Sequence, residues 1–320
     1  MSSNKKKKKR RHGCGCLSVL LCLVVICVGV FAALRLVPLP AMRAVDAEEL
    51  KTNGALPDDW LNIMLLGADS GAYARSDTMM IASIHRSTGE IKLTSIMRDT
   101  YVPIEGHGKN KINTATHFGG VDLALKTVNQ SFGMNVSKYA MVDFSAFAYI
   151  VEALGGVDVP VSEAEMQSVN QLMQDMRVLY PEIELAKNDL TTYGDSVHLD
   201  GMQALAYARI RKLDSDYNRT SRQRTLIKAI AARFASPSGL MAIGDVYRAA
   251  RAHVETNLTT AEVVLLGAKA FTAGFDFKEL RLPVDGTYSA QRIDGQDCLV
   301  PDLAANEKKL FDFIYGSSEG

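Results

Sequence analysis

Hydrophobic positions along the chain alternate between short apolar runs and longer stretches at helical spacing. The apolar runs 61–67, 78–85 and 90–96 are typical of buried strands, and residues 86–89 predict a hairpin turn between the last two. Apolar residues over 121–132 then recur at the spacing of a helix. Alternating strands and helices indicate an α/β layered sheet.

The alternation continues toward the C-terminus, where helices become more frequent. We expect a strand at 139–144, a helix at 145–154 that stops at two glycines, and a short strand at 157–161. No break after residue 60 demands a second domain, so the pattern predicts a single α/β domain. Beyond residue 162 we expect one strand, at 277–282, and helices at 162–176, 201–208, 219–235, 238–252, 260–271 and 302–314.

Residues 17–34 contain no charged side chain and are dominated by Leu, Val, Ile, Cys, Phe and Ala. Their length approaches the roughly 20 residues that span hydrocarbon, which predicts one transmembrane helix. The seven cations Lys5 to Arg11 precede this run, so the positive-inside rule places the N-terminus in the cytoplasm and the rest of the chain outside. A cleaved signal peptide is the alternative, although the apolar run exceeds the usual length of about 7–15 residues.

This topology sets the expected organisation of the chain at the cell membrane. The basic tail is expected to attract anionic lipid headgroups, whereas nucleic-acid binding is the less favoured interpretation of the cations. The stretch before residue 60 holds three prolines and no apolar period, which is typical of a stalk. We therefore expect a basic cytoplasmic tail at 1–16, a transmembrane anchor at 17–36, a stalk at 37–59 and an extracytoplasmic catalytic domain at 60–316.

Charge and composition narrow the possible chemistry. The 320 residues include 36 basic and 36 acidic side chains, so removing the seven N-terminal cations leaves a net charge of −7 on the remainder. The glycine-rich motifs of ATP and nicotinamide enzymes, Gly-x-Ser-x-Gly and His-Glu-x-x-His are all absent. The six histidines lack the spacing of zinc ligands, so a metal should be a hard cation on oxygen ligands.

The first candidate cluster follows the predicted strand 61–67. Asp69 comes just after this strand, and Arg75 and Asp77 stand at the start of the next one. Carboxylates at strand ends can converge on one site, and two of them beside an arginine suit a Mg²⁺ ion completed by water and phosphate oxygens. The alternative is that both carboxylates are ordinary turn residues that cap the strands.

The second candidate cluster follows the predicted strand 90–96. Arg98 and Asp99 come directly after this strand, and Lys111 lies a short distance along the chain. An arginine in this place lies at a sheet edge, where α/β folds tend to build their sites. The alternative is a solvated surface salt bridge between Arg98 and Asp99.

The third cluster is the densest in arginine. Arg209 and Arg211 point the same way only if the backbone there is extended, so the preceding helix should end near residue 208. Arg219, Arg222 and Gln223 stand at i, i+3 and i+4 and therefore share one helical face. Guanidinium groups arranged in this way suit bidentate capture of phosphate, whereas the alternatives are a solvated basic face or contact with membrane phosphates.

Together the clusters suggest phosphoryl chemistry on an anionic substrate outside the membrane. Since no nucleotide is available there to supply energy, the donor must arrive already activated. A lipid-linked pyrophosphate meets this requirement, because the anchor holds the domain beside the bilayer that carries such lipids. A carboxylate near the metal, Asp77 or Asp99, is the hypothesis for deprotonation of the acceptor hydroxyl.

The ordered motifs over about residues 60–235 resemble the LytR-CpsA-Psr family of bacterial cell-envelope proteins. The stretches that carry the resemblance are 62–69, 75–78, 98–101, 111–113, 142–144, 153–158, 198–211 and 216–223. The resemblance implies a three-layer α/β/α sandwich with a central mixed sheet and a pocket for a polyprenyl chain. It also implies Mg²⁺-dependent transfer of a glycopolymer, such as teichoic acid or capsule, from a polyprenyl pyrophosphate carrier to peptidoglycan, with Mn²⁺ as an alternative ion.

The same resemblance assigns roles to individual residues. Asp69 and Asp77 would bind the metal, and Arg75, Arg98, Arg209 and Arg211 would hold the pyrophosphate. Lys111, Arg219 and Gln223 would lie in or beside the site. Two alternative functions remain open at this point: hydrolysis of the polyprenyl pyrophosphate with water as acceptor, and a non-catalytic envelope regulator or transcriptional attenuator that binds lipid phosphates.

Overall fold

The structure is a computed structural model, and it describes residues 48–68, 76–181, 183–210, 216–242, 244–246, 248–249, 254–259, 262, 265–266 and 277–316. Among these residues, no helix combines the length and the apolar character that a membrane crossing requires. The predicted tail at 1–16 and anchor at 17–36 lie outside the described residues.

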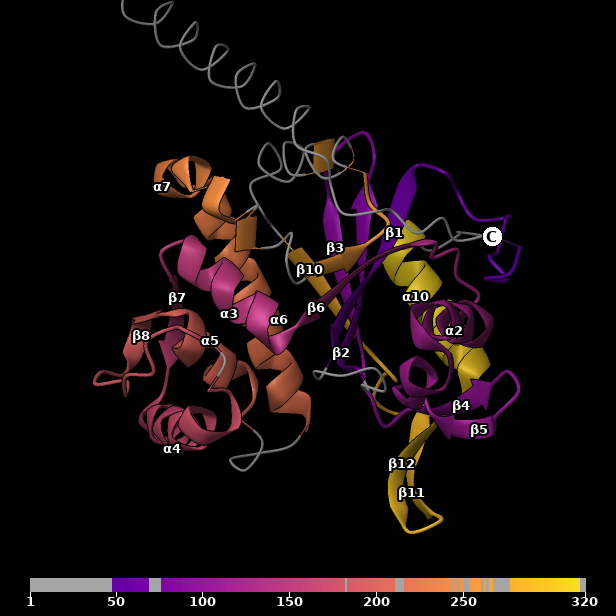
Figure 1. The fold of residues 1–320 in the computed structure, drawn as a ribbon. Helices are drawn as coiled ribbons and strands as arrows, with labels where there is room; N and C mark the ends of the chain where they lie inside the picture. Colours follow the sequence, from indigo (N-terminus) through magenta and orange to yellow (C-terminus); the bar gives the residue numbers. More distant parts are fainter. Residues whose placement is uncertain are drawn as a thin grey trace, which may run out of the picture.

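A six-stranded mixed sheet forms the centre of the fold (Figure 1). Its order is β10 (Phe277–Leu282), β3 (Ile91–Ile96), β2 (Ser76–His85), β1 (Trp60–Ala68), β6 (Lys138–Asp143) and β9 (Val254–Thr256). The β1–β6 and β3–β10 pairs are parallel, and the other pairs are antiparallel. All six residues of β3 are buried, as expected for an apolar strand inside a covered sheet. The predicted mixed α/β fold with a central mixed sheet is confirmed.

Helices α2 (Thr114–Phe132) and α10 (Leu303–Tyr315) cover one face of the sheet, to its right in Figure 1. Their apolar side chains pack with Met64, Leu66 and Ile81 of the sheet in one hydrophobic cluster. Leu50 belongs to the same cluster and is 1% exposed, and Asn129 donates a hydrogen bond to its carbonyl. The folded domain therefore includes residues 48–59, which the sequence pattern assigned to the stalk.

A larger helical layer lies beside the opposite face, to the left of the sheet in Figure 1. Its own core holds Val151, Val169, Met173 and Leu205. A separate cluster joins the sheet residues Leu61, Ile63 and Leu93 to Ile227 of this layer. The elements of this layer are α3 (Phe144–Ala153), β7 (Val157–Val161), α4 (Glu163–Leu179), β8 (Gly194–Leu199), α5 (Gly201–Ala208), α6 (Asp216–Ala235) and α7 (Pro237–Met241).

Strands account for the largest differences from the sequence pattern. The described chain contains six strands that the pattern did not predict, and most are short or largely exposed: β4 (Tyr101–Ile104), β5 (Gly108–Lys111), β8, β9, β11 (Tyr288–Ile293) and β12 (Gln296–Pro301). In β11 and β5 no residue is buried, so neither strand has the apolar alternation that marks a half-buried strand. The expectation of a single strand after residue 162 was therefore wrong.

Among the predicted helices, α5 ends at Ala208 as expected, and α6 begins three residues earlier than predicted. The helix predicted at 238–252 is interrupted at residue 242, because α7 ends at Met241, and the described residues 244–246 and 248–249 are helical again. Most of the helix predicted at 260–271 lies outside the described residues.

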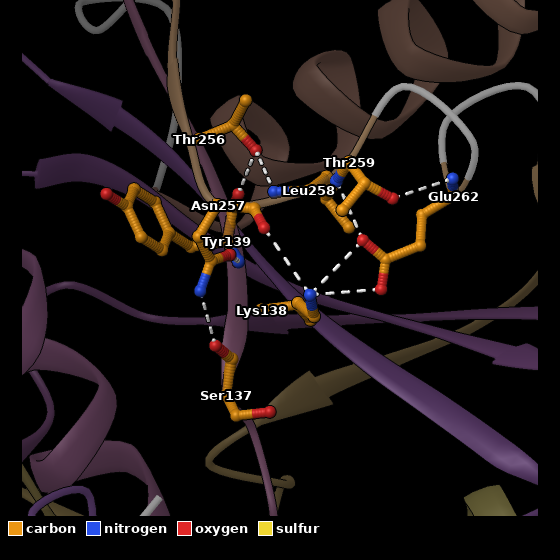
Figure 2. A network of polar contacts seen from close by, with 8 residues as sticks. All are labelled: Ser137, Lys138, Tyr139, Thr256, Asn257, Leu258, Thr259 and Glu262. Carbon is orange, nitrogen blue, oxygen red and sulfur yellow. Dashed lines mark hydrogen bonds and ion pairs between the residues drawn. The ribbon is translucent and has the colours of Figure 1, made fainter. Parts of the chain in front are cut away.

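Polar contacts hold the short edge strand β9 on β6 (Figure 2). Asn257 accepts a hydrogen bond from the amide of Tyr139 and donates one to the carbonyl of Ser137. Lys138 forms an ion pair with Glu262 at 3.0 Å, and the amide of Glu262 donates to the Thr259 hydroxyl. Side-chain contacts of this kind compensate for a strand that is only three residues long and therefore forms few backbone hydrogen bonds.

Candidate functional site

The direction of the strands brings the predicted site residues to one edge of the sheet. Strands β1, β3, β6 and β10 run the same way, and β2 runs opposite to them. The carboxyl ends of those four strands and the start of β2 therefore share one edge. Along this edge the strands follow in the order β10, β3, β2, β1 and β6. Arg98 lies just beyond β3, Ser76 and Asp77 begin β2, and Phe144 lies just beyond β6. We call this the carboxyl edge.

Arg98, Asp99 and Lys111 meet beside the end of β3. The Nζ of Lys111 donates to Oδ1 of Asp99 at 2.6 Å, and Nε of Arg98 lies 3.5 Å from Oδ2. Hairpin β4–β5 delivers Lys111, because Lys111 pairs with Tyr101 in its register. All three side chains are about one-fifth exposed, so the contact is a partly buried ion cluster and the simple surface salt bridge is not supported.

Buried polar groups link this cluster to the start of β2. The amide of Asn113 donates to the Arg98 carbonyl, and the Thr116 hydroxyl donates to the Asn113 carbonyl. Thr116 in turn accepts a hydrogen bond from the amide of Ser76, the residue before Asp77. The Oδ1 of Asn113 and the Oγ of Ser76 are buried, and neither has a hydrogen-bond partner among the described residues.

Arg209 lies on two aromatic rings beyond the end of β6. Its guanidinium carbon is 4.1 Å from the ring centre of Phe144 and 5.3 Å from that of Tyr180. Its Nη1 also donates to the Tyr180 hydroxyl at 2.5 Å. Contact with the two rings and the hydrogen bond to Tyr180 hold the guanidinium in a position from which its N–H groups can donate to an anion. Phe144 and Tyr180 were not predicted as site residues, although the position of Phe144 directly after β6 is a signal for the carboxyl edge.

Several predicted site residues fall where the structure describes no side chain. Asp69, Arg75 and Arg211 lie outside the described residues, and only the backbone of Asp77 and Arg219 is described. Gln223 is half-buried on α6. The structure therefore places Arg98, Asp99, Lys111 and Arg209 at or beside the carboxyl edge, and the metal-ligand role of Asp69 and Asp77 stays a prediction.

Two arginines of α6 are buried in ion pairs with neighbouring elements. Arg222 is 5% exposed, and its Nε donates to Glu165 of α4 at 2.7 Å. Arg224 is 7% exposed and forms an ion pair with Glu279 of β10. Both guanidinium groups are thus used to pack α6 against its neighbours. The interpretation of Arg222 as part of a phosphate-binding face was wrong, because tertiary packing buries it.

The fold and this edge define a class: a mixed α/β protein whose cationic side chains gather at one sheet edge, an arrangement that suits a phosphorylated ligand. Residues 41–310 match the model of the LytR_cpsA_psr family, and the chain belongs to this family. The expected family membership is confirmed.

Individual relatives agree with this assignment. The chain is 33% identical over 273 residues to the polyisoprenyl-teichoic acid–peptidoglycan teichoic acid transferase TagU of Bacillus mycoides (strain KBAB4), covering 84% of this chain and 83% of that protein. It superposes on the crystal structure of B. subtilis TagT with a TM-score of 0.63 at 26% identity, covering 83% and 96% of the two chains. The family protein YwtF (TagT) with bound octaprenyl pyrophosphate lipid gives a TM-score of 0.60 at 25% identity, covering 83% and 95%.

Proposed function

We propose that this chain transfers a glycopolymer from a polyprenyl pyrophosphate carrier to peptidoglycan. The observation that carries the proposal is the set of cations at the carboxyl edge, where Arg98 and Lys111 lie beside β3 and Arg209 stands on its aromatic platform beyond β6. A pyrophosphate needs several guanidinium or ammonium groups in fixed positions. The named activity of TagU and the lipid bound to TagT are the chemistry that such a site accommodates.

The reaction balances without an external energy source. An acceptor hydroxyl oxygen attacks the phosphorus that carries the glycan, the phosphoanhydride bond breaks, and polyprenyl phosphate leaves. The acceptor proton goes to a carboxylate, for which Asp77 is our candidate. The cations stabilise negative charge that develops on both phosphates, an effect that is strong because the groups are preorganised and partly buried.

Asp99 has a different role in this proposal. Its carboxylate is held between Lys111 and Arg98, so both of its oxygens are engaged by cations. Asp99 therefore fixes the two cations in place and is a positioning residue. The hypothesis that Asp99 acts as a base is less well supported by this geometry.

Magnesium is part of the proposal, with manganese as the alternative ion. The described residues contain no group of three or more His, Cys, Asp or Glu side chains that would hold a metal by themselves. Oxygen donors suit a hard cation, and the side-chain oxygens of Asn113 and Ser76 have no hydrogen-bond partner within the part of the chain that the structure describes. Ser76 directly precedes Asp77, and Thr116 connects Ser76 to Asn113 through hydrogen bonds. When bound, Mg²⁺ would act as a Lewis acid that withdraws charge from the phosphoryl oxygens.

A transfer assay with the full chain in membranes tests the proposal. The donor is a synthetic polyprenyl-pyrophosphoryl glycan, the acceptor is peptidoglycan oligomers with Mg²⁺, and both labelled glycan and polyprenyl phosphate are followed. We expect Arg98→Ala and Arg209→Ala to lower transfer at least about a hundredfold, since each removes a preorganised donor to the transition state. The matched control is Arg177→Ala, because Arg177 pairs with Asp189 on the exposed surface of α4.

Each alternative function has its own outcome in this assay. Release of polyprenyl phosphate without labelled peptidoglycan identifies a hydrolase. Retention of the lipid with no product at all identifies a non-catalytic binding protein. Either result replaces the transferase proposal.

A further inference from the structure

A pocket of about 750 Å³ lies at the β10 end of the carboxyl edge, outside the predicted pyrophosphate-binding set. Apolar groups of Met97, Cys298 and Leu299 line part of it. Asp99 also lines it, so the pocket adjoins the ion cluster of Arg98 and Lys111. Its volume lies within the range of about 300–1,000 Å³ that is common for small-molecule sites.

The β11–β12 hairpin supplies much of the pocket and extends beyond the sheet, at the bottom of Figure 1. Backbone contacts fix the base of the hairpin beside the ion cluster. The amide of Leu299 donates to the carbonyl of Asp99 at 2.9 Å, and Thr100 forms an isolated parallel β-bridge with Leu299. The amide of Asp302 donates to the carbonyl of Thr287 across the hairpin base. A group bound in the pocket is therefore held at a fixed position relative to the ion cluster.

The charges of the pocket disfavour a polyanion. Two guanidinium groups, of Arg281 and Arg292, face three carboxylates, of Asp99, Asp285 and Asp297. Arg281 is paired with Asp285, and its hydrogen bond holds the pKa of the Asp285 carboxyl below the usual range. Asp99 is paired with Lys111 and Arg98, and Arg292 stands opposite Asp297 in the hairpin register, so the pocket offers no excess of cations that would attract a chain of phosphates.

The remaining groups suit the hydroxyl and amide groups of an uncharged sugar. Carboxylates accept hydrogen bonds from hydroxyls, and the amide of Gln291 both donates and accepts. Tyr288 adds an aromatic ring with a polar tip, which combines apolar contact with hydrogen bonding. This combination is chemically different from the cationic set at Arg98 and Arg209.

We propose that the pocket binds an uncharged saccharide unit of the acceptor glycan and presents its neighbouring hydroxyl to the pyrophosphate site. The proposal rests on the transferase function and identifies where its second substrate binds. The donor is less suited to this pocket, because a teichoic-acid-type polymer carries a phosphate in each repeat. The order along the carboxyl edge agrees, since the pocket lies at the β10 end and the stacked Arg209 lies beyond β6.

A matched pair of glutamine variants in the full chain tests the pocket. Gln291 lines the pocket, whereas Gln296 lies across the same hairpin, is exposed and does not line it. We expect Gln291→Ala to raise the KM for peptidoglycan oligomers about five- to tenfold with the donor KM unchanged, the loss typical of one hydrogen bond. Gln296→Ala should leave both values unchanged. An altered donor KM in Gln291→Ala, or no change in either KM, overturns the proposal.

A binding measurement separates failure of the pocket from failure of the transferase function. Peptide-free N-acetylated glycan oligomers are titrated into the full chain in nanodiscs, with inorganic pyrophosphate as a second probe. We expect Gln291→Ala and Tyr288→Ala to weaken glycan binding and to leave pyrophosphate binding intact, and Arg209→Ala to do the reverse. Glycan binding with this pattern supports the pocket even if the wild type transfers nothing, whereas glycan binding that is equal in all variants overturns it.

Discussion

Arg209 shows at the residue scale how neighbouring side chains determine what a cation does. Its guanidinium is stacked on Phe144 and hydrogen-bonded to Tyr180. Arg222 has the same side chain and lies thirteen positions further on, yet it is buried in an ion pair with Glu165. Charge alone therefore does not distinguish the two arginines, whereas their contacts do.

The stacked geometry of Arg209 predicts that a lysine cannot replace it. We expect Arg209→Lys to lower transfer about tenfold or more, because an ammonium keeps the charge but loses the planar stack and the paired N–H groups. The measurement is the rate of glycan transfer at saturating acceptor. Arg177→Lys on the exposed face of α4 is the control, and equal rates for Arg209→Lys and the wild type would contradict the role of stacking.

The ion cluster predicts a specific phenotype for Asp99. As a positioning residue, Asp99→Asn should raise the donor KM several-fold through poorer placement of Lys111 and Arg98, with the shape of the pH–rate profile preserved. A general base would behave differently, since its loss removes the acidic limb of the profile. Transfer rates over about pH 5 to 9 at two donor concentrations decide between the roles.

At the scale of elements, the helical layer depends on close approaches between helix backbones that the sequence pattern does not predict. Gly201 begins α5, and a Cβ at this position would lie 2.1 Å from the carbonyl oxygen of Ala148 in α3. Backbone atoms cannot move aside as a flexible side chain does. The glycine therefore sets the distance between α3 and α5, the helix that ends next to Arg209.

We expect Gly201→Ala to destabilise the fold by about 1–3 kcal/mol, the usual cost of overpacking. The measurement is the midpoint of urea unfolding followed by circular dichroism. Gly244→Ala is the matched control, because a methyl group added at this position would have no atom within 4 Å. A Gly201→Ala midpoint equal to that of this control would show that the two helices separate without cost.

The contact between α4 and α6 predicts a dependence of stability on pH. Burial by itself would raise the pKa of Glu165, but hydrogen bonds from Arg222 and Ser162 outweigh it and lower the pKa below 4.5. A lowered carboxyl pKa stabilises the fold above the unfolded-state pKa, and this contribution is lost as the pH falls through the folded-state value.

The expected result is a loss of unfolding free energy in the wild type below about pH 4.5, and a smaller loss in Glu165→Gln over the same range. At neutral pH the variant should be less stable by about 1–3 kcal/mol, since Arg222 keeps only part of its hydrogen bonding. Urea unfolding over about pH 3 to 7 gives both quantities. Parallel curves for the two proteins would show that Glu165 does not titrate with folding.

At the scale of the whole molecule, the sequence predicts an external domain on a single N-terminal anchor. An alkaline phosphatase fusion at the C-terminus is expected to be active in cells, and a matching cytoplasmic reporter to be inactive, because the seven cations stay on the cytoplasmic side. Replacing Lys5 to Arg11 with serines should reduce this orientation. An active cytoplasmic reporter on the unaltered chain would overturn the topology and the extracytoplasmic site together.

Local sequence by itself determined the apolar strands and most helix positions. The runs at β1, β2 and β3 are rich in apolar residues, so strand formation and burial follow directly from their composition. The ordered motifs also determined the family. Arg98 and Arg209 were identified because each directly follows a predicted strand or helix, and Lys111 because it lies in one of the ordered motifs.

Only the tertiary structure decided how side chains distant in sequence are paired. The burial of Arg222 and Arg224, the aromatic support of Arg209 and the pocket at β11–β12 each depend on elements that are far apart along the chain. The exposed strand β11 and the three-residue edge strand β9 show no hydrophobic period that a sequence pattern could detect. Pairing with a neighbouring strand, and not burial of their own side chains, stabilises them. The sequence thus determined which groups are available for the chemistry, and packing decided which of them lie where a substrate can reach them.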